Sequence, residues 1–152
     1  MKEPIHGIDF IGFSIAFYCN DGKGTFVMHK RSKNTRDEQG MWDFGGGKVE
    51  FGSEIEESVL REVQEEYGVE GKIQEQLPAH STIREQNGKQ THWIVIPFFV
   101  EVDLSKVKNN EPHKIDEIGF FKLNDLPNPI HSAVKHTMEK YSEYFDNYRI
   151  AI

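Results

Sequence analysis

The spacing of hydrophobic and polar residues along this chain predicts a mixture of strands and helices. Stretches rich in Ile, Val and aromatic residues predict strands at residues 8–18, 25–30, 72–83, 92–102 and 117–123. Turn-forming Asn, Asp and Gly residues at 20–24 and 86–89 predict hairpin turns. Pro78 and Pro97 each remove a backbone donor, so we expect the strands that contain them to bend or to lie at a sheet edge.

Residues 54–67 carry the clearest helical pattern. Apolar residues recur there every four positions, at Ile55, Val59, Val63 and Tyr67. Ser53 followed by Glu56 has the spacing of a capping box, so Ser53 is expected to cap the first turn. Gly68 is expected to end the helix in a left-handed conformation. A second amphipathic helix is expected at residues 130–147.

The order of strands, helix, strands and helix is typical of a mixed α/β fold. With 152 residues and no repeat or linker, the chain is expected to form a single domain over residues 1–152. Its first residues lack the apolar core of a signal peptide, no apolar run is long enough to span a membrane, and Cys19 is the only cysteine. These features predict a cytoplasmic protein that does not insert into a membrane.

The charge balance narrows the class of ligand. With 25 acidic and 18 basic residues, the chain has a formal net charge of −7. Binding to DNA or RNA depends on neutralising many phosphates, so a chain this acidic is not expected to bind nucleic acid. A small anionic ligand is still compatible, because a divalent cation can reverse the local field.

Three acids gather on one side of the predicted helix. Glu62, Glu65 and Glu66 fall within an arc of about 100° on a regular α-helix. They lie in its C-terminal half, where the helix dipole disfavours negative charge, and Glu62 and Glu66 repel each other across one turn. A solvated polar face is one interpretation of this pattern. A Mg²⁺ site is the other, because carboxylate oxygens are the ligands that this cation prefers.

Three consecutive glycines, Gly45 to Gly47, precede this helix. Glycine lets the backbone come close to a ligand, and such a run can present carbonyl oxygens to a metal or amides to a phosphate. A flexible turn is the commoner meaning of three glycines. Because these glycines stand shortly before an acidic helix, we expect the two segments to form one site.

Residues 47–69 resemble the Nudix box, whose pattern is G-x5-E-x7-R-E-U-x-E-E-x-G-U with U an aliphatic residue. The chain reads Gly47, five residues, Ser53, seven residues and then Arg-Glu-Val-Gln-Glu-Glu-Tyr-Gly-Val. Ser53 is the one fixed position that differs, and Glu50 or Glu54 is expected to supply the missing charge. The resemblance implies the family's α/β/α sandwich with a mixed sheet.

The resemblance also implies an activity and roles for particular residues. Nudix enzymes hydrolyse nucleoside diphosphates linked to a second group. With Mg²⁺ or Mn²⁺ as the cofactor, the metal ligands in this chain would be Glu62, Glu65 and Glu66, with the carbonyl of Gly47 or of Gly46. One of these glutamates would orient or deprotonate the attacking water, and Arg61 would position them through Glu65, one turn away. Glu111 is a further candidate for the catalytic base, with Asp116 and Glu117 as alternatives.

The substrate is less closely determined than the reaction. Arg31 and Lys48 are candidates for binding substrate phosphates, with ordinary surface charge as the alternative. Residues 111–127 resemble the corresponding segment of nucleoside triphosphate diphosphatases, which favours a (d)NTP, oxidised or not, cleaved to the monophosphate and pyrophosphate. Hydrolysis of ADP-ribose, a nucleotide sugar or a dinucleotide is the alternative, and a non-catalytic nucleotide sensor is a second one. Many relatives are dimers, so a homodimer is compatible with the resemblance.

Overall fold

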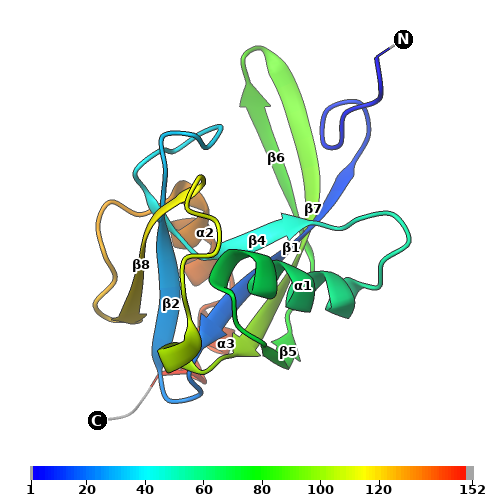
Figure 1. Ribbon diagram of the computed structural model, residues 1–152. Helices are drawn as coiled ribbons and strands as arrows, with labels where there is room; N and C mark the ends of the chain where they lie inside the picture. Colours follow the sequence, from blue (N-terminus) through cyan, green and yellow to red (C-terminus); the bar gives the residue numbers. More distant parts are fainter. Residues whose placement is uncertain (1, 150–152) are drawn as a thin grey trace.

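The computed structural model describes residues 2–149, in which helices cover an eight-stranded sheet (Figure 1). The strands are β1 (Gly12–Asn20), β2 (Thr25–Arg31), β3 (Trp42–Asp43), β4 (Gly45–Lys48), β5 (Lys72–Gln76), β6 (His80–Gln86), β7 (Lys89–Glu101) and β8 (Ile115–Lys122). The helices are α1 (Ile55–Tyr67), α2 (Ser132–Lys140), α3 (Ser142–Asp146) and the short 3₁₀ helix η1 (Leu104–Lys106).

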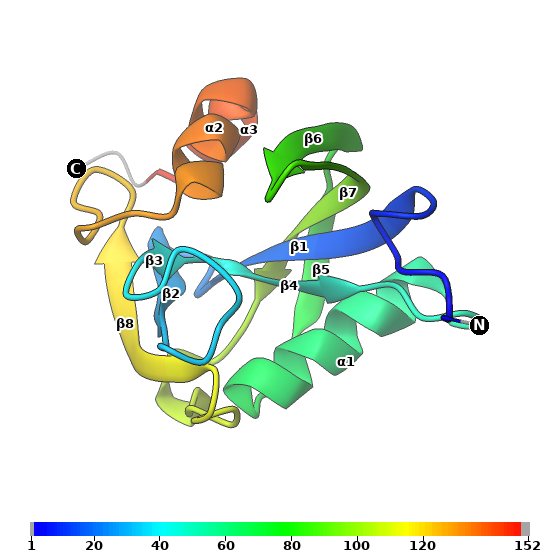
Figure 2. The same ribbon diagram turned by 90° about the horizontal axis from the view of Figure 1, so that it is seen from above.

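The sheet is mixed and lies between two helical layers. α1 covers one face, and α2 and α3 cover the other (Figure 2). β1 and β7 pair in parallel, whereas the other paired strands are antiparallel. The predicted α/β/α sandwich with a mixed sheet is therefore confirmed. None of the helices within residues 2–149 has the length and hydropathy that crossing a bilayer requires.

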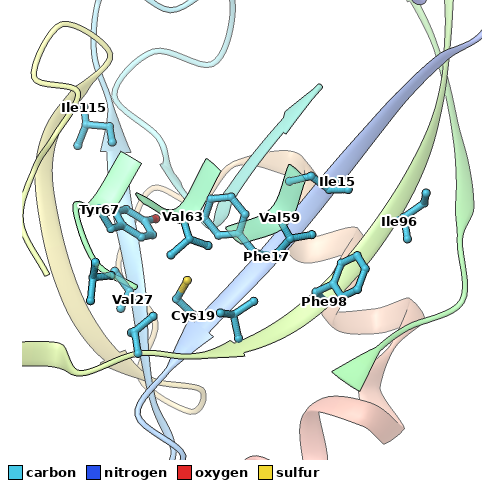
Figure 3. Packing of buried hydrophobic residues seen from close by; sticks show 13 residues of the cluster. Ile15, Phe17, Cys19, Val27, Val59, Val63, Tyr67, Ile96, Phe98 and Ile115 are labelled. Atoms are coloured by element: carbon cyan, nitrogen blue, oxygen red, sulfur yellow. The ribbon is translucent and has the colours of Figure 1, made fainter. Parts of the chain in front are cut away.

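Each face of the sheet has its own hydrophobic cluster. Under α1, Val59, Val63 and Tyr67 are fully buried against inward residues of the sheet such as Phe17 (Figure 3). The face under α2 and α3 holds a mostly aromatic cluster that includes Tyr18, Phe26, Phe44, Phe99 and Phe145. Ile55, expected in the buried stripe of α1, is 38% exposed, so the stripe begins one turn later, at Val59.

β1 and β2 diverge along the sheet. They pair only beside their connecting turn, where Asn20 lies opposite Phe26, and then separate (Figure 1). The glycine strand β4 pairs with the part of β1 that lies away from this turn, and β3 pairs with the far end of β2. The sheet is therefore open between these two pairs of strands, and the glycines border the opening.

Pro97 neither interrupts β7 nor places it at a sheet edge, because β7 pairs with β1 on one side and with β5 and β6 on the other. The Pro97 carbonyl accepts a hydrogen bond from Leu77 N at 2.8 Å, so its nitrogen also points toward the segment that joins β5 and β6. β6 pairs with β7 up to Val95, and β5 pairs with β7 from Phe98 onward. The missing donor thus falls between two partner strands, where the ladder needs none. Pro78 separates β5 from β6, as expected.

The helix expected at residues 130–147 is divided into α2 and α3. α2 begins after His131, whose Nδ1 accepts a hydrogen bond from Ala133 N at 3.0 Å. It ends at Tyr141, whose buried side chain donates from Oη to Pro78 O at 2.6 Å. Anchoring Tyr141 in this way redirects the chain, and α3 then places Phe145 in the aromatic cluster.

The segment before β1 forms a turn and not the first part of a strand. Gly7 has a φ of +80°, a conformation that side chains disfavour, and its carbonyl accepts from His92 N at 2.8 Å. A Cβ atom at Gly7 or Gly12 would overlap the ring of Trp93. The two glycines therefore allow this segment to cover Trp93, and β1 begins only at Gly12.

We predict that Gly45→Ala lowers the free energy of unfolding by about 1–3 kcal/mol, the usual cost of an added methyl group in a filled core. The new Cβ would overlap the ring of Phe17, which is fully buried. The loss is expected to be smaller in a Phe17→Leu background, because Leu leaves room for the methyl group. Urea denaturation of the four proteins in this cycle measures the coupling. Equal losses in both backgrounds would contradict the contact.

Candidate functional site

α1 begins after a loop in which Ser53 does not act as predicted. The residue at the N-cap is Glu54, and its side chain makes no capping hydrogen bond. The Ser53 hydroxyl accepts a hydrogen bond from Arg61 Nη1 at 3.3 Å. The predicted capping box is therefore wrong, because the hydroxyl is oriented toward a cation two turns along the helix. Gly68 ends α1 with a φ of 62°, as predicted.

Arg61 contacts the loop before α1 and not the end of the helix. Its Nη2 lies 4.0 Å from Glu50 Oε2. Of the two acids expected to supply the charge missing at Ser53, Glu50 is therefore the one near Arg61. Within residues 2–149, Arg61 forms no hydrogen bond or ion pair with Glu65, and the expected contact between them is wrong. Helical side chains lean toward the N-terminus, which favours the loop over the following turn. The Arg61 charge still lowers the pKa of the neighbouring Glu62.

Glu62 and Glu66 lie where α1 approaches β4. A Cβ atom at Gly47 would overlap the Glu62 carboxyl group, so the helix and the strand come this close only because position 47 has no side chain. Glu66 is 8% exposed and accepts a long hydrogen bond, 3.4 Å, from Gly46 N. Glu65 is exposed beside them. The structure thus brings the glycines and the acids together, as the sequence predicted.

The carboxylates in this cluster are costly to ionise. Burial, together with the charges of Glu65 and Glu111, raises the pKa of Glu62 to about 7, from an ordinary value of 4.5. Burial also raises the pKa of Glu66 well above its usual range, with further contributions from Glu111 and Glu62. A cation between these groups would reverse both effects, because it favours the ionised form.

The donor atoms around Glu66 suit a hard divalent cation. They are the carboxylate oxygens of Glu66 and of the neighbouring Glu62, and Mg²⁺ prefers oxygen ligands. Glu66 is buried with one long hydrogen bond, so its oxygens can accept further partners. Among residues 2–149, no three acidic or histidine side chains already converge as a metal cage. Glu62 and Glu65 would have to turn toward Glu66 to complete one.

Glu111 approaches the cluster from the loop before β8. Asn110 N donates to Glu66 O at 3.1 Å, which fastens this loop to the C-terminal end of α1. Glu111 is then near enough for its charge to raise the pKa of both Glu62 and Glu66. Two exposed acids of β8 are not among the groups that shift these carboxylates, namely the alternatives Asp116 and Glu117.

A cavity of about 410 Å³ opens beside Glu66, at the divergence of β1 and β2. One wall is the β6–β7 hairpin, which contributes His80, Thr82, Arg84, Gln86, Thr91, Trp93 and Val95. Directly opposite residues of antiparallel strands share a face, and the register pairs His80 with Val95, Thr82 with Trp93 and Arg84 with Thr91. The hairpin therefore presents one polar face to the cavity. This wall was not predicted, because Ser81 and Glu85 are polar too, so β6 shows no two-residue alternation that would mark one face.

Arg31 and Lys48 both line this cavity but differ in their partners. Arg31 Nη2 lies 2.8 Å from Asp37 Oδ1, and its Nη1 lies 3.6 Å from Asp43 Oδ2. Asp37 also accepts a hydrogen bond from Gln86 Nε2 at 3.2 Å. Lys48 forms no ion pair with any residue from 2 to 149. A substrate phosphate would therefore compete with carboxylates for Arg31, whereas Lys48 is available.

The loop between β2 and β3 borders the cavity and is held by Glu38. This residue has a φ of 44°, and its carboxylate accepts from Ser132 N at 2.8 Å. It also lies 2.8 Å from His131 Nε2 and 3.8 Å from Arg84 Nη1. Because His131 Nδ1 accepts from the α2 backbone, its Nε2 carries the proton and donates to Glu38. One carboxylate thus connects the loop to α2 and to β6.

Comparisons with known proteins agree with these features. Residues 11–141 match the NUDIX domain. The chain is 37% identical over 102 residues to the ADP-ribose pyrophosphatase of Methanocaldococcus jannaschii, covering 66% of this chain and 56% of that protein. It is 38% identical over 69 residues to the CTP pyrophosphohydrolase of Escherichia coli, covering 45% and 49%. The chain thus spans about half the length of the curated relatives it matches.

The fold is also similar to solved structures. A MutT NUDIX hydrolase from Burkholderia pseudomallei superposes with a TM-score of 0.74 and 26% identity, covering 86% of this chain and 97% of that one. The domain match extends over most of the chain and includes the glycine strand, the acidic helix and the cavity wall. This chain therefore belongs to the NUDIX domain family.

Proposed function

We propose that this protein hydrolyses nucleoside diphosphates linked to a second group, with Mg²⁺ or Mn²⁺ as the cofactor. The proposed substrates are nucleoside triphosphates, oxidised or not, which are cleaved to the monophosphate and pyrophosphate. Water adds to one phosphorus atom, the bond to the bridging oxygen breaks, and pyrophosphate leaves with the electron pair. A cytoplasmic location, the lack of nucleic-acid binding and a homodimer stay predictions.

The observation that carries the proposal is the contact between buried carboxylates and a strand without side chains. Glu62 and Glu66 are held against Gly46 and Gly47, at the edge of a cavity large enough for a nucleotide. Burying such acids together is unfavourable unless a cation neutralises them. The same cation would attract the phosphates of a substrate, despite the negative charge of the protein.

Different residues of the site have different roles in the proposed reaction. A divalent cation held by Glu62, Glu65, Glu66 and the Gly47 carbonyl would neutralise phosphate oxygens and lower the pKa of a bound water. Glu111, whose charge acts on both Glu62 and Glu66, would accept the proton of the attacking water. Arg61 acts as a positioning residue, because its charge acts on Glu62 and its hydrogen bond holds Ser53. Lys48 and Arg31 would bind the phosphates.

ADP-ribose is the second candidate substrate. The M. jannaschii relative, which is 37% identical over 102 residues, is named an ADP-ribose pyrophosphatase. Both candidates require the same cluster of carboxylates and differ only in the group beyond the second phosphate. A product assay separates them, since a triphosphate releases pyrophosphate and ADP-ribose releases AMP and ribose phosphate.

Glu62→Gln is expected to reduce pyrophosphate release from nucleoside triphosphates by at least about 100-fold, because a group that stabilises charge is lost. The measurement is pyrophosphate and monophosphate formation from a panel of ordinary and oxidised triphosphates with Mg²⁺. Glu57→Gln is the matched control, because Glu57 is exposed in the first turn of the same helix. If wild type cleaves no triphosphate, ADP-ribose, nucleotide sugar or dinucleotide, the proposed activity is wrong and a sensor role is favoured.

The contribution of Glu62 to the stability of the metal-free protein is expected to fall as the pH rises from 5 to 8. The folded pKa of Glu62 is raised to about 7, so its stabilising contribution is complete below its unfolded value, near 4.5, and is lost as the pH rises through 7. The raised pKa of Glu66 changes the stability in the same direction. Thermal melts in EDTA should therefore show that Glu62→Gln stabilises the protein more at pH 8 than at pH 5. The same difference at both pH values would contradict the raised pKa.

A further inference from the structure

His80 lies on the polar face of the hairpin. It is three strands away from Lys48, where the substrate phosphates are proposed to bind. The register places Lys48 beside Ser14, Ser14 beside Val95 and Val95 beside His80, in one row across β4, β1, β7 and β6. With about 4.8 Å between neighbouring strands, the row spans about 14 Å. This is the scale of a nucleotide whose phosphates lie near Lys48 and whose base reaches toward His80.

The hydrogen bonds of His80 determine which of its nitrogens carries the proton. Tyr141 Oη donates its only proton to Pro78 O at 2.6 Å. His80 Nδ1 lies 2.7 Å from the same oxygen, so the proton between them belongs to Nδ1. Burial, with Lys140 and His136 nearby, lowers the pKa of His80 and keeps the ring neutral. Nε2 therefore bears a lone pair; His80 is partly buried, and the one hydrogen bond of its ring within residues 2–149 is made by Nδ1.

The cavity that His80 lines also has an apolar wall, which suits a flat base better than a phosphate. Tyr18, Phe44 and Val134 line the cavity and belong to the aromatic cluster under α2, which also contains Tyr141. The cationic residues that line the cavity come from other positions, Arg31, Arg36, Lys48 and Arg84. A ligand held at its phosphates by these cations would place its base against apolar side chains and one acceptor nitrogen.

We propose that His80 determines base specificity, with Nε2 accepting a hydrogen bond from the exocyclic amino group of the substrate base. The inference rests on the proposed function, since it assigns the base end of the same site. Adenine and cytosine bear such a group, whereas hypoxanthine and uracil present a carbonyl oxygen at the same position. The carbonyl lone pairs would face the lone pair of Nε2, and neither atom could donate.

The direct test compares substrates that differ only in this group. The ratio of kcat/KM for ATP over ITP, and for CTP over UTP, is expected to be at least about tenfold in the wild-type protein, because a carbonyl oxygen at this position displaces water from Nε2 without replacing its hydrogen bond. His80→Leu removes the acceptor and should bring both ratios close to one. Because each ratio compares two substrates of the same variant, a general loss of activity or folding cancels.

A second variant tests the fixed proton position without changing a residue that lines the cavity. Tyr141→Phe removes the acceptor for Nδ1–H, so the His80 proton can move to Nε2 and donate to a carbonyl oxygen. Both ratios should fall in this variant. Tyr148→Phe is the matched control, because Tyr148 packs against the same aromatic cluster. Within residues 2–149 its hydroxyl makes one hydrogen bond, to Glu75 at 3.5 Å. Its ratios should stay at the wild-type value.

Nitrogen-15 NMR of His80 provides a readout that does not depend on hydrolysis. The shifts should show a protonated Nδ1 and a bare Nε2, and the Nε2 signal should move on titration with AMP or CMP but not with IMP or UMP. Ratios near one in wild type, or a protonated Nε2, would overturn the inference while leaving the proposed hydrolysis intact. Selective Nε2 shifts without cleavage of any nucleotide would support the inference and overturn the proposed hydrolysis.

Discussion

The contact between buried carboxylates and a glycine strand is the constraint on which the rest of this structure depends. Glu62 and Glu66 project from the C-terminal half of α1, where the helix dipole opposes their charge. Glu62 fits against β4 only because Gly47 has no side chain, and Glu66 accepts a hydrogen bond from Gly46 N. Burial then raises the pKa of both acids. The unfavourable charge is tolerated because the adjoining face of the same helix is anchored in a dense apolar cluster.

The topology of the sheet connects this charged cluster to a place where a ligand can lie. Because β1 and β2 separate after one paired position, the sheet opens beside β4. The β6–β7 hairpin closes one side of the opening with alternate polar residues, and α2 closes another. Glu38 and Asp37 then join the intervening loop to α2, to β6 and to Arg31. Two cationic residues of the cavity, Arg31 and Arg84, are therefore paired with carboxylates of the loop. A ligand that carries phosphates must displace these carboxylates to bind the two arginines.

The sequence predicted the elements of the site better than the contacts among them. Local rules sufficed for α1, since a four-residue stripe and Gly68 define its extent almost to the residue. They failed for Ser53, because a hydroxyl near a helix start can serve a backbone amide or a distant guanidinium, and spacing alone does not decide between Arg61 and the first turn. The role of His80 requires the register of two strands and the partner of Tyr141, neither of which local pattern contains. Long-range pairing thus supplied what local sequence rules did not.

The measurement that tests the central claim most directly is calorimetric titration of the protein with Mg²⁺ in the absence of nucleotide. The account predicts saturable binding by the wild-type protein and by Glu57→Gln, whose exposed side chain lies in the first turn of α1. In Glu66→Gln, one charged oxygen donor is lost from the buried cluster, and the affinity should fall at least about tenfold. Equal Mg²⁺ affinity in all three proteins, or no binding by wild type, would contradict the assignment of Glu62 and Glu66 to a metal site.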